Sequence, residues 1–267
     1  MPKNIGVFDS GVGGLTVVKE LMKLLPRETI IYFGDTARVP YGNKSAATVT
    51  KYSLQNARFL LQQDIKLLVV ACNTASALSL TALQESFPAL PIIGVIEPGV
   101  NAALKATKSK KVGVAGTLAT ISSQAYNRLL TARAPDVQVY GQACPLFVPL
   151  VEEGWVHKKV TSLIAAEYFS GMKRLGIDTL ILGCTHYPLL KRIIGQVMGK
   201  KVKLVDSAQE AALEVQQILE NKEMAVTKGI GNCLFYVSDI PDKFIIVGQQ
   251  LLGEKIQQAT QIDIEKY

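Results

Sequence analysis

Short apolar segments alternate with longer amphipathic segments along the chain. The short ones, rich in Val, Ile and Leu, predict strands at 4–8, 29–33, 67–71, 91–95, 111–115, 137–140, 179–182, 202–205, 234–237 and 244–247. Between them, apolar residues recur at helical spacing and predict helices at 14–25, 46–63, 74–87, 99–106, 122–133, 158–175, 188–197, 207–220 and 249–260. Uniformly apolar strands that alternate with helices are typical of a parallel sheet covered on both faces. The pattern therefore predicts an α/β fold with binding sites at the carboxyl ends of its strands.

Two motifs recur in the same order and indicate two related halves. KNIGVFDS at 3–10 resembles KKVGVAGT at 110–117, and LLVVACNT at 67–74 resembles TLILGCTH at 179–186. The offsets, 107 and 112 residues, are nearly equal and too long for a solenoid repeat. We predict two pseudo-symmetric α/β domains with mainly parallel sheets and an active site in the cleft between them. The first domain would comprise residues 1–97 and 207–267, and the second residues 98–206.

Composition narrows the class of protein. The net charge of +7 is spread over scattered Lys pairs without interleaved aromatic residues, so we expect a solvated surface rather than nucleic-acid binding. The N-terminal segment leads directly into a strand pattern and lacks the features of a signal peptide. No apolar run approaches the roughly 20 residues of a membrane helix. We therefore expect a soluble cytoplasmic protein that does not bind a membrane.

The cysteines carry the most specific chemical signal. There are four, Cys72, Cys144, Cys184 and Cys233, without the CxxC spacing of metal or redox sites. With only two histidines, His157 and His186, a zinc site is not expected, and the thiols should be free in a reducing cytosol. Cys144 and Cys233 are interpreted as structural residues and His157 as a surface residue.

Cys72 and Cys184 differ from the other two because each follows a strand and precedes a predicted helix. The free N–H groups at a helix N-terminus favour a thiolate, so we expect lowered thiol pKa values there. Two thiols on opposite faces of one small substrate can invert a stereocentre, because one removes a proton from carbon while the other donates one. A redox pair that closes a disulfide is the alternative, although the two residues need not be close enough for that bond.

Polar residues at other strand ends are candidates for the same site. Asp9 begins DSGVGG at 9–14, which is a poor match to a phosphate-binding loop, and it is better interpreted as a partner that orients a neighbouring group. GDTARVPYG at 34–42 is either a structural turn or a ligand clamp that uses the Tyr41 hydroxyl and the Gly42 N–H. Thr117 and Thr120 suit a carboxylate, but Thr120 is equally interpreted as a helix cap.

Taken together, these motifs resemble glutamate racemase, a member of the aspartate/glutamate racemase family. The resemblance rests on DSGVGG at 9–14, GDTARVPYG at 34–42, ACNTAS at 71–76, GTLAT at 116–120, CPLFVPLVEEGW at 144–155 and GCTHYP at 183–188. It spans residues from about 4 to 190. It implies a two-domain α/β enzyme that racemises glutamate without a cofactor or metal and supplies D-glutamate for peptidoglycan. A homodimer is also expected.

The resemblance also implies roles for individual residues. Cys72 would act as the base for D-glutamate and Cys184 as the base for L-glutamate. Asp9 and His186 fall on auxiliary acid/base positions, and Glu152 falls on a position that orients the histidine. The residues that match substrate-binding positions are Asp9, Ser10, Tyr41, Gly42, Asn73, Thr74, Thr117, Thr120, Thr185 and His186. The nearest alternative is a racemase of the same superfamily that acts on aspartate.

Overall fold

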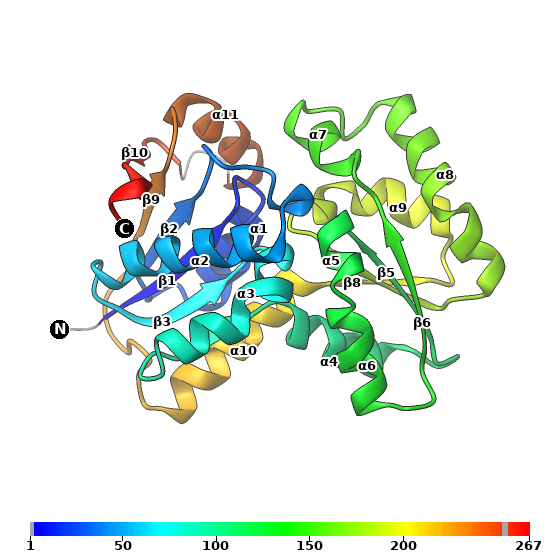
Figure 1. Cartoon of the computed structure of the whole chain (residues 1–267), viewed down its shortest axis with the longest axis horizontal. Helices are drawn as coiled ribbons and strands as arrows, with labels where there is room; N and C mark the ends of the chain where they lie inside the picture. The colour runs from blue at the N-terminus through cyan, green and yellow to red at the C-terminus, as the bar shows by residue number, and fades with distance from the viewer. Residues whose placement is uncertain (1–2, 253–255) are drawn as a thin grey trace.

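The apolar segments form two separate sheets in the computed structural model, which describes residues 3–252 and 256–267 (Figure 1). The first sheet has the order β10 (Thr260–Gln261), β9 (Cys233–Val237), β2 (Ile30–Gly34), β1 (Asn4–Asp9), β3 (Ile65–Val70), β4 (Ile92–Gly94). The second has the order β6 (Gln138–Ala143), β5 (Lys111–Gly116), β7 (Thr179–Gly183), β8 (Lys203–Asp206). All strand pairs in the described residues are parallel, which confirms the predicted fold class.

The order of the strands explains the repeat in the sequence. β2, β1, β3 and β4 follow one another in the first sheet as β6, β5, β7 and β8 do in the second. The repeated motifs therefore begin at equivalent strands, β1 with β5 and β3 with β7. The last two strands extend the first sheet beyond β2. The domain boundaries at 97/98 and 206/207 stay predictions.

Helices cover both faces of each sheet (Figure 1). In the first sheet, neighbouring residues point to opposite faces: Val7 packs with α1 (Leu15–Leu24), α10 (Ser207–Asn221) and α11 (Pro241–Leu252). Phe8 packs with α2 (Ala46–Leu61) and α3 (Asn73–Ser86) on the other face. The second sheet lies between α8 (Lys159–Leu175) and α9 (Lys191–Met198) on one face and α4 (Ile96–Ala106) and α6 (Ala125–Arg133) on the other.

Two short α-helices and three 3-10 turns complete the described chain. They are α5 (Leu118–Ser122), α7 (Phe147–Glu152) and the 3-10 turns η1 (Tyr41–Asn43), η2 (Tyr187–Leu190) and η4 (Ile264–Lys266) with their connecting loops. Neither α5, α7 nor η1 was predicted from the sequence. The helix predicted at 122–133 corresponds to α6, which begins only at Ala125 because Gln124 adopts a left-handed conformation with φ of 57°. Among all helices of the described residues, none is long and apolar enough to cross a membrane.

The prediction for the C-terminal region was wrong. Residues 244–247 belong to α11 rather than to a strand, because Phe244, Val247 and Leu251 form one buried helical face. A short apolar run does not distinguish a buried strand from a buried helix. Of the predicted helix at 249–260, residues 249–252 are helical and Thr260 lies in β10, while 253–255 lie outside the described residues.

A buried ion pair fixes the long segment between α10 and β9. Lys66 Nζ in β3 lies 2.7 Å from Glu28 Oε2, and both side chains are almost inaccessible to solvent. Lys66 also donates to the carbonyl of Met224 at 2.6 Å, and Glu28 Oε1 accepts from the N–H of Val226 at 2.8 Å. These contacts connect the first sheet to a segment that has little regular structure of its own.

Replacing Lys66 with Met should lower the free energy of unfolding by about 3–5 kcal/mol, because it leaves the Glu28 carboxylate buried without a countercharge. Urea denaturation measures the change. Lys110→Met is the matched control, since Lys110 pairs with Asp136 at the exposed surface, and it should leave stability nearly unchanged. Equal effects of the two substitutions would contradict the structural role of the buried pair.

Candidate active site

Both cysteines of the matched pair lie at carboxyl ends of central strands. Cys72 follows β3 and is the residue immediately before α3, and Cys184 directly follows β7. β3 and β7 occupy equivalent places in the two sheets, so the two halves present their cysteines in the same way. Both residues line one cavity between the sheets, and each is at most 6% exposed.

This cavity gathers most of the residues that the sequence analysis singled out. Its lining contains Ser10, Tyr41, Gly42, Cys72, Asn73, Thr74, Thr117, Cys184, Thr185 and His186, together with Val39, Pro40 and Val148. Its volume is about 20 Å³, which is room for about one water molecule. A wider recess of about 220 Å³ shares Val39, Gly42 and Thr117 with it and extends to Glu152. The site is therefore nearly closed in this structure.

Cys72 is buried beside Ser10. Its Sγ is 3.8 Å from the hydroxyl of Ser10. Burial, and then the negative charge of Asp9, raise the pKa of the Cys72 thiol to about 12, and the N–H of Ala75 in α3 lowers it only in part. The expectation that the helix N-terminus would lower this pKa is therefore wrong for Cys72, because desolvation outweighs the helix.

Asp9 does not line the cavity but lies directly behind it. Its side chain is fully buried, and Oδ2 accepts from the N–H of Gly11 at 3.0 Å. Oδ1 accepts from the Thr185 hydroxyl of the other half at 3.3 Å. Burial raises the pKa of this carboxyl above its usual range, and the charge of His186 opposes that shift. Asp9 thus positions Thr185 and places a titratable group beside Cys72.

His186 connects Cys184 to a carboxylate. Its Nδ1 lies 3.9 Å from Cys184 Sγ, and its Nε2 lies 3.1 Å from Glu152 Oε1 at the end of α7. Burial alone would lower the pKa of His186, but its contacts with Cys184 and Glu152 outweigh burial and raise the pKa to about 10. For the Glu152 carboxyl, burial alone would raise the pKa. The hydrogen bond and the charge of His186 outweigh burial and bring the pKa of Glu152 below its usual range.

The turn after β1 approaches the second half closely. A Cβ on Gly13 would collide with Thr185 Oγ1 and with His186 Nδ1. Glycine is therefore required here by a protein contact.

Three threonine hydroxyls form a triangle across the cleft. Thr74 of α3 lies 2.9 Å from Thr117 and 3.1 Å from Thr120, and the last two are 3.0 Å apart. Thr117 caps α5 by accepting from the N–H of Thr120, so the cap is Thr117 and not Thr120. Apart from this cap the three hydroxyls bond to one another, so each can turn its hydrogen to a carboxylate while Thr117 still accepts from the N–H of Thr120.

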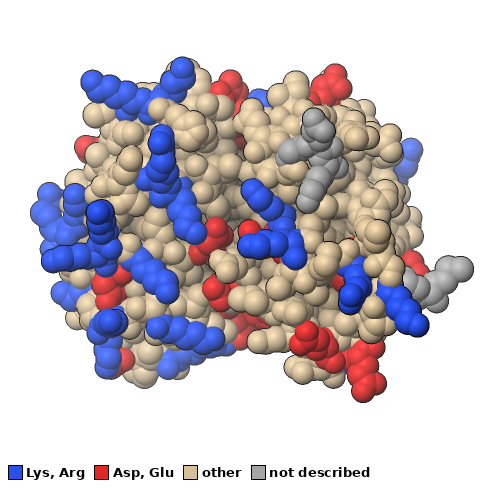
Figure 2. All heavy atoms as spheres, turned by 180° about the vertical axis from the view of Figure 1, so that it is seen from behind, with Lys and Arg blue, Asp and Glu red and all other residues tan. Residues whose placement is uncertain are grey.

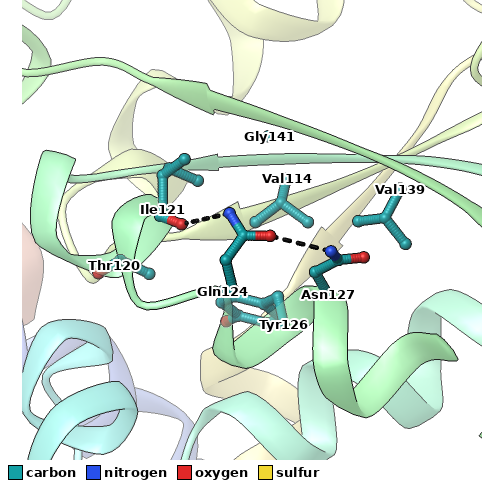
Figure 3. Close-up of a pocket in the computed structure, with 8 residues that line it drawn as sticks. All are labelled: Val114, Thr120, Ile121, Gln124, Tyr126, Asn127, Val139 and Gly141. Atoms are coloured by element: carbon teal, nitrogen blue, oxygen red, sulfur yellow. Dashed lines mark hydrogen bonds between the residues drawn. The ribbon is translucent and has the colours of Figure 1, made fainter. Parts of the chain in front are cut away.

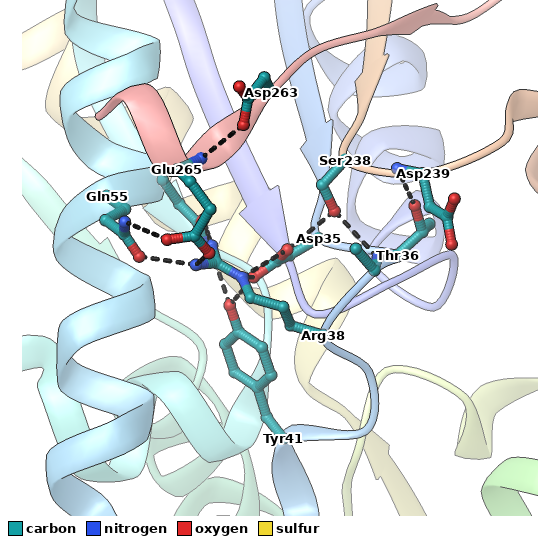
Figure 4. Close-up of polar contacts among 11 residues, drawn as sticks. Asp35, Thr36, Arg38, Tyr41, Gln55, Ser238, Asp239, Asp263 and Glu265 are labelled. Carbon is teal, nitrogen blue, oxygen red and sulfur yellow. Dashed lines mark hydrogen bonds and ion pairs between the residues drawn. The ribbon is translucent and has the colours of Figure 1, made fainter.

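A network of polar side chains outside the cavity stabilises the loop at 34–42 (Figure 4). Arg38 donates from Nε to both oxygens of Asp35, at 2.8 and 3.0 Å, and also contacts Gln55 and Glu265. The Tyr41 hydroxyl donates to Asp35 Oδ2 and not into the cavity. This corrects the expectation that the hydroxyl serves a ligand; Tyr41 instead lines the cavity while anchoring the loop.

The sequence analysis did not assign several residues that shape the site. Asp35 and Arg38 lie inside a motif that had been noticed, but nothing in the motif shows that they pair with each other. Tyr126, which contacts Asn73, lies in an ordinary amphipathic helix and gives no signal. Within the described residues, no cluster of three or more His, Cys, Asp or Glu side chains suits a metal ion.

Charge is unevenly divided between the halves. Residues 98–206 carry 15 Lys and Arg against six Asp and Glu, whereas the rest of the chain carries 14 against 16. In Figure 2 the blue side chains accordingly gather on the left, over the half built around the second sheet. The positive potential over this half raises the local concentration of anionic small molecules.

Comparison with known proteins identifies this two-sheet α/β protein as a racemase. Residues 5–215 match the Asp/Glu/hydantoin racemase family, and the chain belongs to that family. It is 56% identical over 264 residues to a glutamate racemase from Geobacter metallireducens, and the alignment spans 98% of this chain and 97% of the relative.

Solved structures agree with this assignment. The glutamate racemase of Francisella tularensis in complex with D-glutamate is 42% identical, covers 100% of this chain and 99% of its own, and superposes with a TM-score of 0.94. The Thermus thermophilus glutamate racemase in complex with beta-chloro-D-alanine is 45% identical at the same coverage, with a TM-score of 0.89. The chain is thus an isomerase similar to glutamate racemases.

The His186 imidazole should stay protonated until about pH 10 and titrate at lower pH in Glu152→Gln, because that substitution removes the negative partner of the imidazolium. NMR of the histidine ring protons measures both midpoints. The chain has only two histidines, so His157→Asn identifies the His186 signal. An unchanged midpoint in Glu152→Gln would contradict the coupling between these two side chains.

Proposed function

We propose that this enzyme interconverts L- and D-glutamate without a cofactor, using Cys72 and Cys184 as its two bases. The observation that carries the proposal is the single cavity lined by both cysteines together with hydroxyl and amide donors. The similarity to glutamate racemases over nearly the whole chain supports glutamate as the substrate.

In the direction from L- to D-glutamate, the Cys184 thiolate removes the α-proton and the C–H electron pair stays on carbon. The Cys72 thiol then donates its proton to the opposite face of that carbon, which leaves a thiolate on Cys72. The reverse direction exchanges the two roles. Burial raises the pKa of Cys72 to about 12, which suits the proton donor of the L-to-D direction, and the His186 ring lies 3.9 Å from the Cys184 sulfur.

The auxiliary residues differ on the two sides of the substrate. Asp9 would assist proton transfer at Cys72, and His186 would do so at Cys184. Glu152 accepts a hydrogen bond from the imidazole and would hold its orientation. The α-proton of an amino acid is very weakly acidic, so the site must stabilise a carbanion-like transition state with fixed dipoles.

Hydroxyl, amide and backbone N–H donors can bind the two substrate carboxylates without a full positive charge. The polar groups available are the hydroxyls of Ser10, Thr74, Thr117 and Thr185, the amide of Asn73 and the backbone N–H of Gly42. Thr120 would contribute through its hydrogen bonds to the other two members of the threonine triangle.

Glutamate requires more room than about 20 Å³, so the cleft must open to admit it. We expect the two halves to move apart for entry and to close on the bound substrate. The radius of gyration from small-angle X-ray scattering should therefore be smaller with saturating D-glutamate than without it. Identical profiles in the two conditions would count against this motion.

D-glutamate produced here would supply peptidoglycan synthesis, a role suggested by the resemblance to glutamate racemases. We also propose a homodimer in the cytoplasm, without a nucleic-acid partner. Growth of a D-glutamate-requiring bacterial strain that expresses the chain tests the cellular role, and sedimentation tests the oligomeric state.

Cys72→Ala and Cys184→Ala should each lower kcat for racemisation by at least about 10³-fold, because each removes one of the two proton-transfer groups. Circular dichroism of L-glutamate measures the rate, in the presence of a chelator and without added pyridoxal phosphate. Cys233→Ala is the matched control, since Cys233 lies in β9 outside the cavity, and it should stay within a few-fold of wild type.

Other results would redirect the assignment. Activity with aspartate but not with glutamate would keep the mechanism and change the substrate. Inactivity with both, together with a Cys72–Cys184 disulfide detected by mass spectrometry, would favour a redox protein. Full activity of either alanine variant would rule out the two-thiol mechanism.

A further inference from the structure

We propose that Tyr126 is a positioning residue that orients the Asn73 carboxamide so that its NH₂ group faces the substrate cavity and donates to a carboxylate. This inference rests on the proposed function and assigns a role to a residue that does not itself touch the substrate. It depends on three observations: a buried hydrogen bond, the donor left free at the other end of the amide, and the place of Tyr126 between the two cysteine segments.

The hydrogen bond joins the two halves of the molecule. Tyr126 lies in α6, close to Thr120, beside a small cavity of about 30 Å³ (Figure 3). Its hydroxyl is directed to the first half, where it lies 2.7 Å from Asn73 Oδ1 in α3. Tyr126 is 3% exposed and Asn73 is also 3% exposed, so water does not readily replace either partner. A buried hydrogen bond of this kind costs most when only one partner is removed.

In this bond the amide presents its oxygen to Tyr126, so its NH₂ group points the other way. A carbonyl oxygen only accepts, so the Tyr126 hydroxyl must donate to Asn73 Oδ1. Burial raises the pKa of Tyr126 far above its usual range, which keeps the hydroxyl a donor at every working pH. Ser207 Oγ, at 3.4 Å, lies on the other side of the hydroxyl and can donate to it in turn.

The opposite end of the amide remains available. Among the described residues, Asn73 Nδ2 has no hydrogen-bond partner, and it is not sealed from solvent. Because Asn73 lines the cavity next to Cys72, an NH₂ group there offers two donors to a carboxylate. If the amide were reversed, its oxygen would face the substrate carboxylate and repel it.

Tyr126 also touches the segment of the second cysteine. A Cβ on Gly183, the residue before Cys184, would lie 3.2 Å from the Tyr126 ring, so glycine lets the ring pack closely against this strand end. The ring is thus in contact with the residue before Cys184, and the hydroxyl with the residue after Cys72. A single side chain therefore connects the two strand ends that carry the thiols.

Tyr126→Phe tests the inference, since it removes only the hydroxyl and keeps the ring. KM for both enantiomers, and the Kd of D-glutamate measured by calorimetry, should rise about tenfold. We expect kcat to change less than about threefold, because the groups that transfer protons are untouched. Tyr140→Phe is the matched control: its hydroxyl bonds to Gln138 on the edge strand β6, and its kinetics should match wild type.

A double-substitution cycle separates positioning from a general structural effect. Asn73→Ala should raise KM at least as much as Tyr126→Phe does, and combining the two should add less than about twofold more. The inference would be overturned if the increases in KM of the two single variants multiplied in the double variant. It would also be overturned if Tyr126→Phe left KM and Kd unchanged. Urea denaturation of each variant verifies that folding is retained.

The outcomes also separate this inference from the proposed function. An active wild-type enzyme with an unaffected Tyr126→Phe variant would overturn the role of Tyr126 alone. A wild-type chain that neither binds nor racemises glutamate would overturn both, since Tyr126 would then have no substrate-binding amide to orient.

Discussion

Hydrogen bonds between buried polar side chains hold the two halves of this molecule together, and the placement of both thiols depends on them. Thr185 donates to Asp9, Thr74 meets Thr117, and Tyr126 donates to Asn73. Each bond joins a strand end of one sheet to a strand end or helix start of the other. Apolar packing builds the core of each half, and Leu189 packs against the cores of both. The polar contacts lie where the cysteine-bearing edges of the two halves meet.

The same contacts make the site both closed and able to open. A hydrogen bond that can be exchanged for one to water contributes only about 0.5–1.5 kcal/mol net, so a few of them stabilise a closed cleft without locking it. Bound carboxylates would replace the hydroxyl-to-hydroxyl bonds of the threonine triangle with stronger charge-assisted ones. Closure on the substrate would then exclude water and strengthen the electrostatic interactions around the reacting carbon.

The two thiols have different surroundings although their strands are equivalent. Cys72 lies beside Ser10 and the buried carboxyl of Asp9, while Cys184 lies beside the imidazole of His186. Pseudo-symmetry of the fold thus places two like groups in the lining of one cavity, and the neighbouring residues give each thiol different surroundings. This difference suits a reaction whose two directions begin from mirror-related substrates.

How much of this structure the sequence predicts depends on whether a feature is local. β1, β3, β5 and β7 were predicted because an uninterrupted apolar run is a local signal, and the repeat identified them as equivalent pairs. α11 was missed because Phe244 to Val247 is equally apolar as a strand or a helix.

The residues of the site bond to partners that lie far away in the sequence. Asp9 and Thr185 are 176 residues apart, and Tyr126 and Asn73 are 53 apart, so no spacing in the sequence connects them. The motif around Tyr41 indicated a loop at the site, but only the folded chain shows its hydroxyl bonded to Asp35. The burial that raises the pKa of Cys72 is likewise a property of the assembled halves.

The most direct test of two opposed bases is the position of deuterium in the first turnovers. L-glutamate would be incubated with the enzyme in D₂O, and the reaction stopped before about one tenth of the substrate has reacted. The two enantiomers would then be separated, and the deuterium content of each measured by mass spectrometry. Two separate thiols predict deuterium at Cα of the D-glutamate formed and almost none in the remaining L-glutamate. Product that retains the original hydrogen would contradict the account, because one base would then have carried the same proton from one face to the other.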